Sequence, residues 1–347
     1  MKVSRRPAIF FGFKPWKDYV LRWFPDRDCK VVSRKARDML LWGWPLRLLL
    51  YRSPEVYVWG FKYPPSLKWF CHRFGIPFYH VEDGFIRSVS LGAQRSPPAS
   101  LIIDSQTLHY DARNASDLEH TLQTYDFAAD EALMERAEKC IRMLLDLRVS
   151  KYNLGKRVNL DTILGPKTTR RVLVIGQVET DASIAFGCDR PVTNNDLVRL
   201  AASENPGAQI IYKPHPEVLH GTRSGVSDPA EVADICEMLK EDIAPADALE
   251  GIDRVYTITS LMGFEALLRG IPVTCYGMPF YAGWGVTDDR QLCERRTRRL
   301  TAPAIFSAAY LLRSRYFDPA TSEPTRLEAV ISELGNGVFC RAPATGT

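Results

Sequence analysis

Short apolar runs alternate with amphipathic segments along the second half of the chain. The pattern predicts strands at 172–175, 209–212, 254–258 and 273–276, with helices between them at 195–203, 231–240 and 261–269. Strands separated by helices favour a parallel, doubly wound sheet. Because ligands of such sheets bind beyond the carboxyl ends of the strands, the loops that follow these strands are the first candidates for a functional site.

The first half of the chain shows a similar alternation. Strands are expected at 8–13, 56–59, 76–81 and 101–104, and a helix at 128–147. Residues 151–171 are rich in Lys, Arg, Asn, Gly and Thr and lack apolar periodicity, which indicates a boundary. Since 347 residues exceed what one core usually holds, two α/β domains are predicted. The expected parts are a Rossmann-like domain at 1–150, a linker at 151–171, a second Rossmann-like domain at 172–302, and a C-terminal segment at 303–347 whose helices, at 305–316 and 327–334, are placed to return to the first domain.

Composition is that of a globular protein, with 46% hydrophobic and 25% charged residues. The longest nearly apolar run, 39–51, is interrupted by Pro45 and Arg47 and is too short to cross a bilayer. The N-terminus has only about five hydrophobic residues behind its basic start, fewer than a signal peptide needs. The eight cysteines form no CxxC pair and no Cys/His cluster, which indicates reduced thiols and no metal site. A cytoplasmic protein is therefore predicted.

Charge is distributed unevenly along the chain. The net charge is +4, but residues 1–60 carry 13 Lys or Arg against 5 Asp or Glu, so this stretch alone is +8. Basic residues mixed with tryptophan suit an anionic membrane surface or a phosphorylated acceptor. A basic helix face on a globular domain is the alternative. The stretch holds five of the seven tryptophans: Trp16, Trp23, Trp42, Trp44 and Trp59.

Two of the loops after predicted strands carry acidic residues. Glu82 and Asp83 precede Gly84 in the segment HVEDGFIRS, where a tight turn is the simpler explanation. Gln177 and Asp181 stand in GQVETD, directly after a predicted buried strand. A carboxylate at that strand tip faces a ligand, or else it caps the segment that follows.

Two further loops carry cationic and hydroxyl groups. His215 lies between two prolines in YKPHPE, beside Lys213 and Glu217, and the prolines hold its backbone extended. This setting favours a functional histidine over a structural one. In TSLMGFE, Thr259 or Ser260 is placed to cap a helix whose first backbone N–H groups suit a phosphate, although a plain capped helix has the same pattern.

Missing motifs narrow the class of ligand. Without a GxGxxG motif, nicotinamide and flavin dinucleotides are disfavoured. Residues 165–168 lack the P-loop spacing, and the DxD at 26–28 lies in the basic N-terminal stretch and not at a strand end of the second domain. The pattern that remains is a metal-free site for a nucleotide whose phosphate is held by a histidine, hydroxyl groups and a helix N-terminus. Nothing indicates nucleic-acid binding.

Five motifs occur in one order along the chain: EDGFIRS, GQVETDAS, YKPHPEV, TSLMGFEALLRG and MPFYAGWGVTDDR. Together they resemble one catalytic module of the KpsC-type bacterial capsule β-Kdo transferases. The similarity runs from Phe10 to Leu334 and includes SKYNLG and RYFDP. Members of that family typically carry two such modules, and the FKPWK and GQVETDAS segments look more like the second. A looser similarity to bacterial sialyltransferases fits the same donor type, a CMP-activated 2-keto acid.

The resemblance implies a glycosyltransferase-B arrangement, with two Rossmann-like domains facing across a cleft, the acceptor side in the first and CMP in the second. It also implies a metal-independent enzyme without cofactor that transfers Kdo from CMP-β-Kdo with retention of configuration. Asp181 then matches the family's nucleophile and Glu82 its acid/base, while His215 and Ser260 match residues at the CMP phosphate. An aspartate can trap an oxocarbenium-like centre covalently, and a second carboxylate can take the acceptor proton.

Other matched residues take supporting roles in this scheme. Lys213 and the helix beginning near Leu261 stabilise the departing phosphate, Glu217 accepts from ribose hydroxyls, and Arg87 pairs with a carboxylate of the Kdo or the acceptor. The remaining donor-side residues are Gln177, Thr259 and Gly263. The residues assigned to the acceptor or to support are Asp83, Gly84, Tyr281 and Trp284.

The leading hypothesis is a retaining β-Kdo transferase of capsule polysaccharide biosynthesis and export, cytoplasmic and peripheral at the inner membrane. Its expected partners are CMP-Kdo, a Kdo-terminated lipid-linked acceptor, an anionic membrane surface and other capsule assembly proteins. Two alternatives stay open. One is a transferase of another CMP-activated nonulosonate such as sialic acid, which side-by-side donor assays would distinguish. The other is a non-catalytic scaffold that binds capsule lipid through the tryptophan-rich N-terminus.

Overall fold

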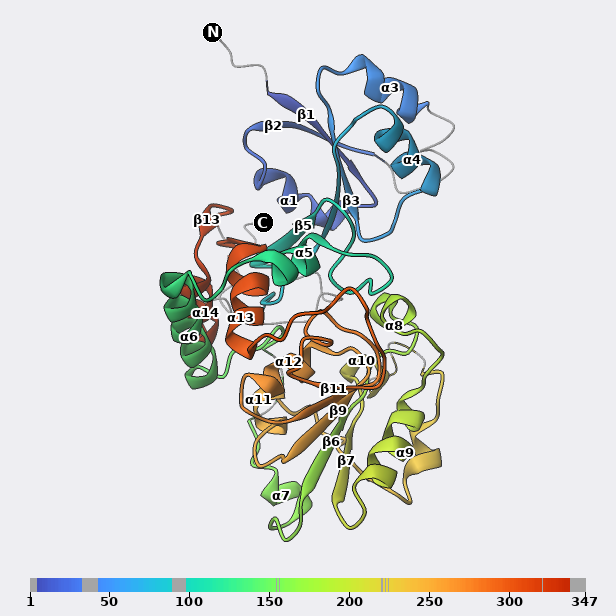
Figure 1. Ribbon diagram of the computed structural model, residues 1–347, viewed down its shortest axis with the longest axis vertical. Helices are drawn as coiled ribbons and strands as arrows, with labels where there is room; N and C mark the ends of the chain where they lie inside the picture. The colour runs from blue at the N-terminus through green and yellow to red at the C-terminus, as the bar shows by residue number, and fades with distance from the viewer. Residues whose placement is uncertain are drawn as a thin grey trace, which may run out of the picture. The chain divides into compact units, whose positions relative to one another are not determined.

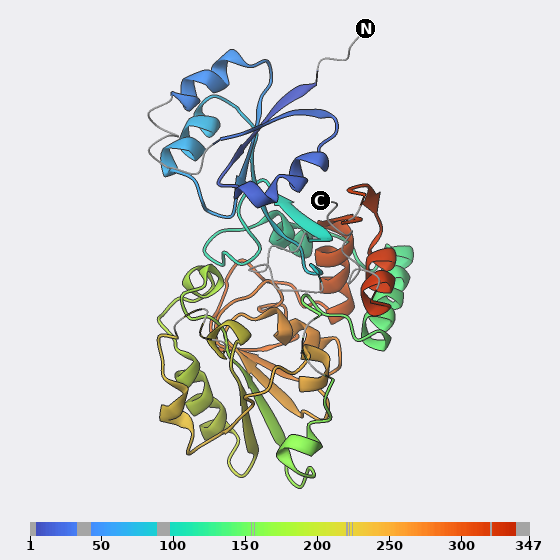
Figure 2. The same cartoon turned by 180° about the vertical axis from the view of Figure 1, so that it is seen from behind.

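The computed structural model describes residues 5–32, 43–88, 98–153, 155, 157–219, 221, 223, 225–319 and 321–337. The chain divides into two compact units: Met1–Leu108 with Leu312–Thr347, and His109–Leu311. Each unit contains one β-sheet and several helices, as Figure 1 and the reverse view in Figure 2 show. The predicted α/β fold class is confirmed.

The sheet of the first unit has seven strands in the order β13-β12-β5-β4-β3-β1-β2. β1 to β4 pair in parallel, whereas β5, β12 and β13 extend the sheet through antiparallel pairs. The four strands predicted here from apolar runs are present, but the sheet is mixed and not wholly parallel. The strands are β1 Arg6–Phe11, β2 Arg27–Val31, β3 Glu55–Trp59, β4 Phe78–Asp83, β5 Ser100–Asp104, β12 Ser314–Phe317 and β13 Pro324–Thr325.

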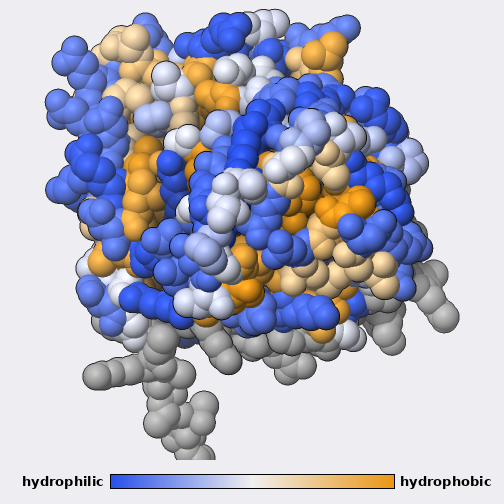
Figure 3. Space-filling view, turned by 90° about the horizontal axis from the view of Figure 1, so that it is seen from below, coloured by the Kyte–Doolittle hydropathy of each residue, from blue (hydrophilic) through white to orange (hydrophobic). Residues whose placement is uncertain are grey.

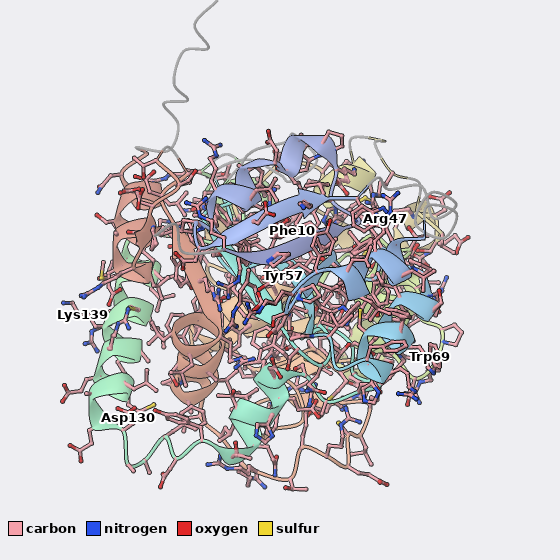
Figure 4. The ribbon with its side chains drawn as sticks, turned by 90° about the horizontal axis from the view of Figure 1, so that it is seen from above. Phe10, Arg47, Tyr57, Trp69, Asp130 and Lys139 are labelled. Carbon is pink, nitrogen blue, oxygen red and sulfur yellow. The ribbon has the colours of Figure 1, made fainter. Side chains whose placement is uncertain are left out.

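The two faces of this sheet carry separate cores. Successive strand residues point to opposite faces, so Phe10 enters one core and Ile9 the other. Figure 4 shows Phe10 and Tyr57 on the sheet, where their rings stack with centroids 5.1 Å apart. The Phe10 core also holds residues of α1, and the Ile9 core holds residues of α3 and α4. The helices and turns of this unit are η1 Pro15–Lys17, α1 Tyr19–Arg22, α3 Trp44–Leu50, α4 Pro65–Arg73 and α14 Leu327–Gly335.

The tryptophans of the basic N-terminal stretch are mostly interior. Trp23 and Trp59 are 6% and 4% exposed, and Trp23 stacks on Phe317 of β12. Trp16 and Trp44 are partly buried against the two cores, while Trp42 lies outside the described residues. The expectation that tryptophans of this stretch face a membrane is therefore wrong for Trp23 and Trp59, which belong to the core, whereas Trp16 and Trp44 are only partly buried against the cores.

The sheet of the second unit is wholly parallel, with the strand order β11-β10-β9-β6-β7-β8, which confirms the predicted doubly wound sheet. β7 and β8 lie on one side of β6, whereas β9, β10 and β11 lie on its other side. The strand order therefore changes direction between β6 and β9. The strands are β6 Arg171–Ile175, β7 Gln209–Lys213, β8 Glu237–Met238, β9 Arg254–Thr257, β10 Val273–Cys275 and β11 Asp288–Asp289. The helices are α5 Asp117–Thr124, α6 Glu131–Asp146, α7 Asp161–Leu164, α8 Ala182–Gly187, α9 Asn194–Glu204, α10 Pro216–Leu219, η3 Pro229–Val232, α11 Pro245–Ala248, α12 Leu261–Leu267, α13 Ala302–Phe306 and the π-helical η4 Ser307–Leu312.

One predicted helix is wrong and another extends too far. The segment 231–240 forms the end of η3 and the short strand β8, because Glu237 and Met238 pair with β7 at the sheet edge. The segment 305–316 begins in α13 and η4 but ends as β12, which pairs with β5. In both segments, strand pairing with distant residues outweighs the local helical pattern.

The division into units differs from the predicted one. The segment 109–150 belongs to the second unit, where Arg148 pairs with Asp247 and the Ser150 hydroxyl donates to Glu265 at 3.0 Å. The predicted linker, 151–171, also lies inside this unit and contains α7. Of the C-terminal segment, the part from Leu312 onward belongs to the first unit.

The cysteines, the helix lengths and the surface hydropathy can be compared with the sequence-based expectations. No disulfide joins the seven described cysteines, and Cys340 lies outside the described residues. In the described part of the chain, no helix combines the length and the apolar character that a membrane span requires. The face drawn in Figure 3 mixes hydrophilic residues with smaller groups of hydrophobic ones.

Arg171 anchors the segment before β6. Its side chain is 1% exposed, donates to Gln209 at 2.8 Å and pairs with Asp161 of α7. Replacing it by leucine removes a buried guanidinium together with its bonds to the part-buried Gln209 and the exposed Asp161, so we expect R171L to lose about 2–4 kcal/mol of unfolding free energy. The exposed neighbour Arg170 provides the matched control, and R170L should change stability by less than about 0.5 kcal/mol. Urea unfolding followed by circular dichroism measures both; equal losses in the two variants would contradict this role.

Candidate active site

The loops after β6 and β9 are joined at the point where the second sheet changes direction. Gln177 follows β6, and its side-chain amide donates to the Thr259 hydroxyl at 3.1 Å. The Thr259 backbone N–H donates back to the Gln177 amide oxygen at 2.7 Å. Both residues are at least nine-tenths buried. The two hydrogen bonds therefore fix the relative position of two loops at the edge where a doubly wound sheet binds its ligand.

Asn194 fixes the same loop from the other side. Its side chain accepts from the Gln177 N–H and donates to the Gln177 carbonyl, both at 2.9 Å. Asn194 is 4% exposed and begins α9. Sequence reasoning did not identify it, because an asparagine at a helix start is equally typical of a simple cap.

The two carboxylates of the GQVETD loop have different surroundings. Glu179 accepts four hydrogen bonds, from the backbone N–H groups of Asn194, Val226 and Ser227 and from the Ser227 hydroxyl. Asp181 caps α8 through Oδ1, which accepts from the Ser183 N–H at 2.8 Å. In the described part of the chain, Asp181 Oδ2 accepts no hydrogen bond. Asp181 is thus both a helix cap and the carboxylate of this loop with an oxygen still available.

His215 lies in the electrostatic neighbourhood of Asp181. Burial lowers the pKa of His215 below its ordinary value, against the opposing negative charges of Glu217 and Asp181. The Glu217 N–H donates to His215 Nδ1 at 3.2 Å, so the neutral ring carries its proton on Nε2. Burial also lowers the pKa of Lys213, which ends β7. Glu217 pairs with Arg223 at 3.4 Å.

The start of α12 confirms the predicted capping residue. The Ser260 hydroxyl accepts from the Met262 N–H, and the Ser260 N–H donates to the Thr257 hydroxyl at 3.0 Å. Tyr281, which is fully buried, donates its hydroxyl proton to the Ser260 carbonyl. Gly263 leaves room for this tyrosine, because a Cβ on Gly263 would overlap the Tyr281 hydroxyl.

The matched aromatic residues of MPFYAGWG are structural. Tyr281 and Trp284 are both fully buried, and the Trp284 indole N–H donates to the Phe280 carbonyl at 2.9 Å. Of the two roles predicted for this pair, acceptor binding or support, the burial favours support. A second buried contact joins the SKYNLG segment to α12, where Glu265 accepts from the Ser150 hydroxyl and the Lys151 N–H. Burial raises the pKa of Glu265.

A second group of charged residues lies at the carboxyl ends of β1, β3 and β4 in the first unit. Glu82 and Asp83 end β4, and Asp83 pairs with Arg87 at 2.9 Å. The Arg87 side chain is fully buried and also donates to the Ser88 hydroxyl at 2.8 Å. Gly84 donates its N–H to the Ser100 carbonyl and has no room for a Cβ beside the Ser100 side chain. The EDG segment is thus a close turn whose two acids remain at the strand end.

Lys17 joins this acidic cluster. It ends the FKPWK segment after β1, lies over the Trp59 ring and is 3.9 Å from Asp83. Its side chain is 8% exposed, and burial lowers the pKa of its amine to about 8 although Asp83 and Glu82 act to raise it. The FKPWK segment supported the family resemblance, but only the fold places Lys17 beside Glu82 and Asp83.

The site residues therefore fall into two groups. One group follows β6, β7 and β9 and contains Gln177, Asp181, Lys213, His215, Glu217, Thr259, Ser260 and Gly263. The other follows β1 and β4 and contains Lys17, Glu82, Asp83, Gly84 and Arg87. Parallel strands present their carboxyl ends at one edge of a sheet, and this accounts for each group. The described residues contain no group of three or more His, Cys, Asp or Glu side chains arranged to hold a metal ion.

The buried amine of Lys17 predicts a specific pH dependence of stability. Its pKa is about 8 in the folded chain against 10.5 ordinarily, so the unfolded chain binds the proton more tightly. Stability therefore rises with pH between these two values. Relative to K17M, the wild-type unfolding free energy should gain about 2 kcal/mol between pH ~7.5 and pH ~10. Denaturant unfolding of both proteins across this range measures the gain, and parallel profiles would show that Lys17 is not desolvated.

The close contact at Gly263 predicts coupling with Tyr281. G263A should lower the unfolding free energy by about 2–3 kcal/mol, although alanine favours a helix over glycine. In a Y281F background the overlapping hydroxyl is gone, while the Thr257 methyl 2.9 Å from the added Cβ remains. The cost of G263A should therefore fall by about 1 kcal/mol or more in that background. A double-mutant cycle by urea unfolding tests this, and additive costs would overturn it.

Comparison with known protein families identifies the group to which the chain belongs. The family model described as "Capsule polysaccharide biosynthesis protein" matches residues 55–317. The lipopolysaccharide-processing protein LpsZ of Rhizobium meliloti is 42% identical over 341 residues, covering 96% of this chain and 76% of that protein. The capsule polysaccharide modification protein LipA of Neisseria meningitidis serogroup A is 38% identical over 325 residues, which cover 93% of this chain. The match spans only 44% of LipA, less than half its length.

Two solved structures from Thermosulfurimonas dismutans share the fold. One is titled KpsC, β-Kdo 2,4 transferase; it is 35% identical with a TM-score of 0.82, and the match covers 96% of this chain and 99% of that one. The other is titled KpsC, β-Kdo 2,7 transferase; it is 30% identical with a TM-score of 0.71, and the match covers 96% and 100%. The resemblance stated from the sequence motifs is thus confirmed, and the chain belongs to the capsule polysaccharide biosynthesis protein family, with the fold of the KpsC β-Kdo transferase modules.

Proposed function

We propose that the protein is a retaining glycosyltransferase that transfers Kdo from CMP-β-Kdo to a Kdo-terminated, lipid-linked acceptor in capsule polysaccharide biosynthesis. The observation that carries this proposal is the contrast between Glu179 and Asp181. Glu179 uses both carboxylate oxygens to hold surrounding backbone, whereas Asp181 keeps Oδ2 available beside the joined loops after β6 and β9. The similarity to the two KpsC β-Kdo transferases supports Kdo as the sugar.

The proposed reaction takes two displacements. In the first, a carboxylate oxygen of Asp181 forms a bond to the anomeric carbon of Kdo, while the bond from that carbon to the phosphate oxygen of CMP breaks and CMP leaves with the electron pair. In the second, the acceptor hydroxyl oxygen bonds to the same carbon, its proton passes to a carboxylate and Asp181 is released. Two inversions restore the original configuration.

Hydrogen-bond donors of the second unit suit the departing CMP. His215 carries its proton on Nε2 in the neutral ring, and Lys213 adds a buried amine close enough to influence the pKa of His215. In this proposal His215, Lys213 and Ser260 stabilise the phosphate without a metal ion, Gln177 and Thr259 shape the site, and Glu217 accepts from the ribose. Gly263 keeps Tyr281 against the carbonyl of Ser260.

The carboxylate that receives the acceptor proton is assigned to Glu82. The family resemblance supports this role, and so does the place of Glu82 at the end of β4 within a charged cluster. Arg87 is fully buried and holds Asp83, so we assign it to positioning Asp83 and not to direct binding of a substrate carboxylate. Lys17 supplies a second positive charge beside these acids.

The linkage and the location follow as parts of the same proposal. The KpsC module titled as a 2,4 transferase is more similar to this chain than the one titled as a 2,7 transferase, which favours a 2→4 linkage. A lipid-linked acceptor requires the protein to work at a membrane, so we propose a peripheral location at the inner face of the cytoplasmic membrane, together with other capsule assembly proteins. Assays with CMP-Kdo and CMP-sialic acid side by side decide the donor.

Substitution of Asp181 tests the proposed nucleophile. D181N should reduce Kdo transfer to a Kdo-terminated acceptor by about 1,000-fold or more, because the amide cannot form the covalent intermediate. The control is D189N, which removes an exposed carboxylate of the same unit and should retain full activity.

Mass spectrometry of the intact protein adds a direct readout. With CMP-Kdo and no acceptor, the wild-type protein and E82Q should gain the mass of one Kdo residue, whereas D181N should gain none. Wild-type turnover in D181N would refute the nucleophile assignment, and an adduct mapped to another residue would relocate it.

A further inference from the structure

Exposed apolar side chains gather on two neighbouring helices of the first unit. Leu46, Leu49 and Leu50 of α3 are 69%, 46% and 85% exposed, and Trp69 of α4 and the adjoining Phe74 are 67% and 49% exposed. These are five of the ten large hydrophobic side chains that are exposed in the described part of the chain. Single exposed hydrophobic residues are ordinary, but a cluster of five indicates a binding surface. We name these five residues the α3–α4 surface.

Helix geometry explains why these side chains are outside. Leu46, Leu49 and Leu50 are spaced i, i+3 and i+4, so they share one side of α3. Leu48 of α3 and Leu67 of α4 enter the core on the sheet instead. The two helices pack against each other, and Figures 1 and 2 both show them side by side. The core therefore takes one side of each helix, and the apolar residues on the other side remain largely exposed.

The charge around this surface has one sign. Residues 43–76 contain five Lys or Arg and a single acidic residue, Glu55. Glu55 is 7% exposed and accepts from Arg27 at 2.8 Å, so it adds no exposed negative charge. Arg47, Arg52 and Arg73 are exposed, and Arg73 lies 5.7 Å over the Phe74 ring. Figure 4 shows Arg47 on α3 and Trp69 on α4 toward the same edge of the view.

We propose that the α3–α4 surface binds the protein to an anionic phospholipid bilayer, with its leucines and Trp69 entering the boundary between headgroups and acyl chains. Apolar residues and exposed arginines in a segment, 43–76, that has no exposed acid complement a surface that is apolar within and negative at its edge. Tryptophan prefers this boundary. This inference rests on the peripheral location in the proposed function. It assigns membrane contact to the α3–α4 surface in place of the buried tryptophans of the basic N-terminal stretch.

Vesicle binding tests the surface without any sugar chemistry. The full-length protein should float with vesicles of equal parts phosphatidylglycerol and phosphatidylethanolamine, and it should bind pure phosphatidylcholine at least about 10-fold more weakly. The triple variant L46S/L49S/L50S should lose about 10-fold or more of the partition coefficient for anionic vesicles. These leucines are exposed, so the variant should unfold at the wild-type urea concentration. R47Q/R52Q/R73Q should weaken binding to anionic vesicles and remove most of its salt dependence.

A matched single substitution controls for the loss of any exposed leucine. Leu50 is 85% exposed on α3 and Leu292 is 90% exposed in the second unit. L50S should reduce vesicle binding, whereas L292S should leave it at the wild-type level. Equal partition of wild type and the triple variant would overturn the proposal. So would conversion of a dimer to a monomer by the triple variant with vesicle binding unchanged, because the surface would then be an interface between copies.

Kdo transfer separates this inference from the proposed function. With a soluble Kdo-terminated acceptor, L46S/L49S/L50S should transfer Kdo as fast as the wild type, because the substituted residues lie outside both groups of site residues. Vesicle binding by a wild-type protein that transfers no Kdo would refute the proposed function and support the membrane surface. Normal transfer by a protein that does not bind anionic vesicles would refute the membrane surface and support the proposed function.

Discussion

The candidate site of the second unit depends on the pair of hydrogen bonds between Gln177 and Thr259. These residues follow β6 and β9, which are neighbours in the sheet although 82 positions separate Gln177 from Thr259. A buried amide that lacked these partners would be costly, so the two loops are held together once the sheet forms. Asn194 fixes the backbone of Gln177 in the same way. Asp181 and Ser260 lie within four residues of this link, so the two hydrogen bonds also restrict the positions of Asp181 and Ser260.

Tertiary contacts assign different roles to residues of the same chemical type. Glu179 and Asp181 are two positions apart, yet the first is held by four hydrogen bonds and the second by one. Arg87 is fully buried against Asp83, whereas Arg47 remains exposed. Buried charges persist in proteins when they are paired, so these two arginines serve structure and surface respectively. Residue type alone does not distinguish the members of either pair.

Sequence patterns predicted the strands around the site more accurately than the boundaries between the two units of the chain. The strands before Gln177, His215 and Thr259 were predicted within one residue of their observed ends, because short buried strands read as continuous apolar runs. The segment 231–240 and the end of 305–316 were predicted wrongly, because β8 and β12 owe their strand form to pairing with β7 and β5. The predicted linker, 151–171, lies inside the second unit for the same reason, since contacts with distant residues hold it there.

By itself the sequence determined the α/β class, the parallel sheet of the second half, the family, and the loops that carry the candidate chemistry, because strand ends and short motifs are local properties of the chain. Only the tertiary structure decided which carboxylate of GQVETD is held by the backbone, where Lys17 lies, and which apolar residues are exposed. Those outcomes depend on pairs of residues far apart in sequence. Trp23 and Trp59 lie in the core, whereas Leu46, Leu49 and Leu50 of α3 are exposed, because a sheet can bury only one side of each helix packed on it.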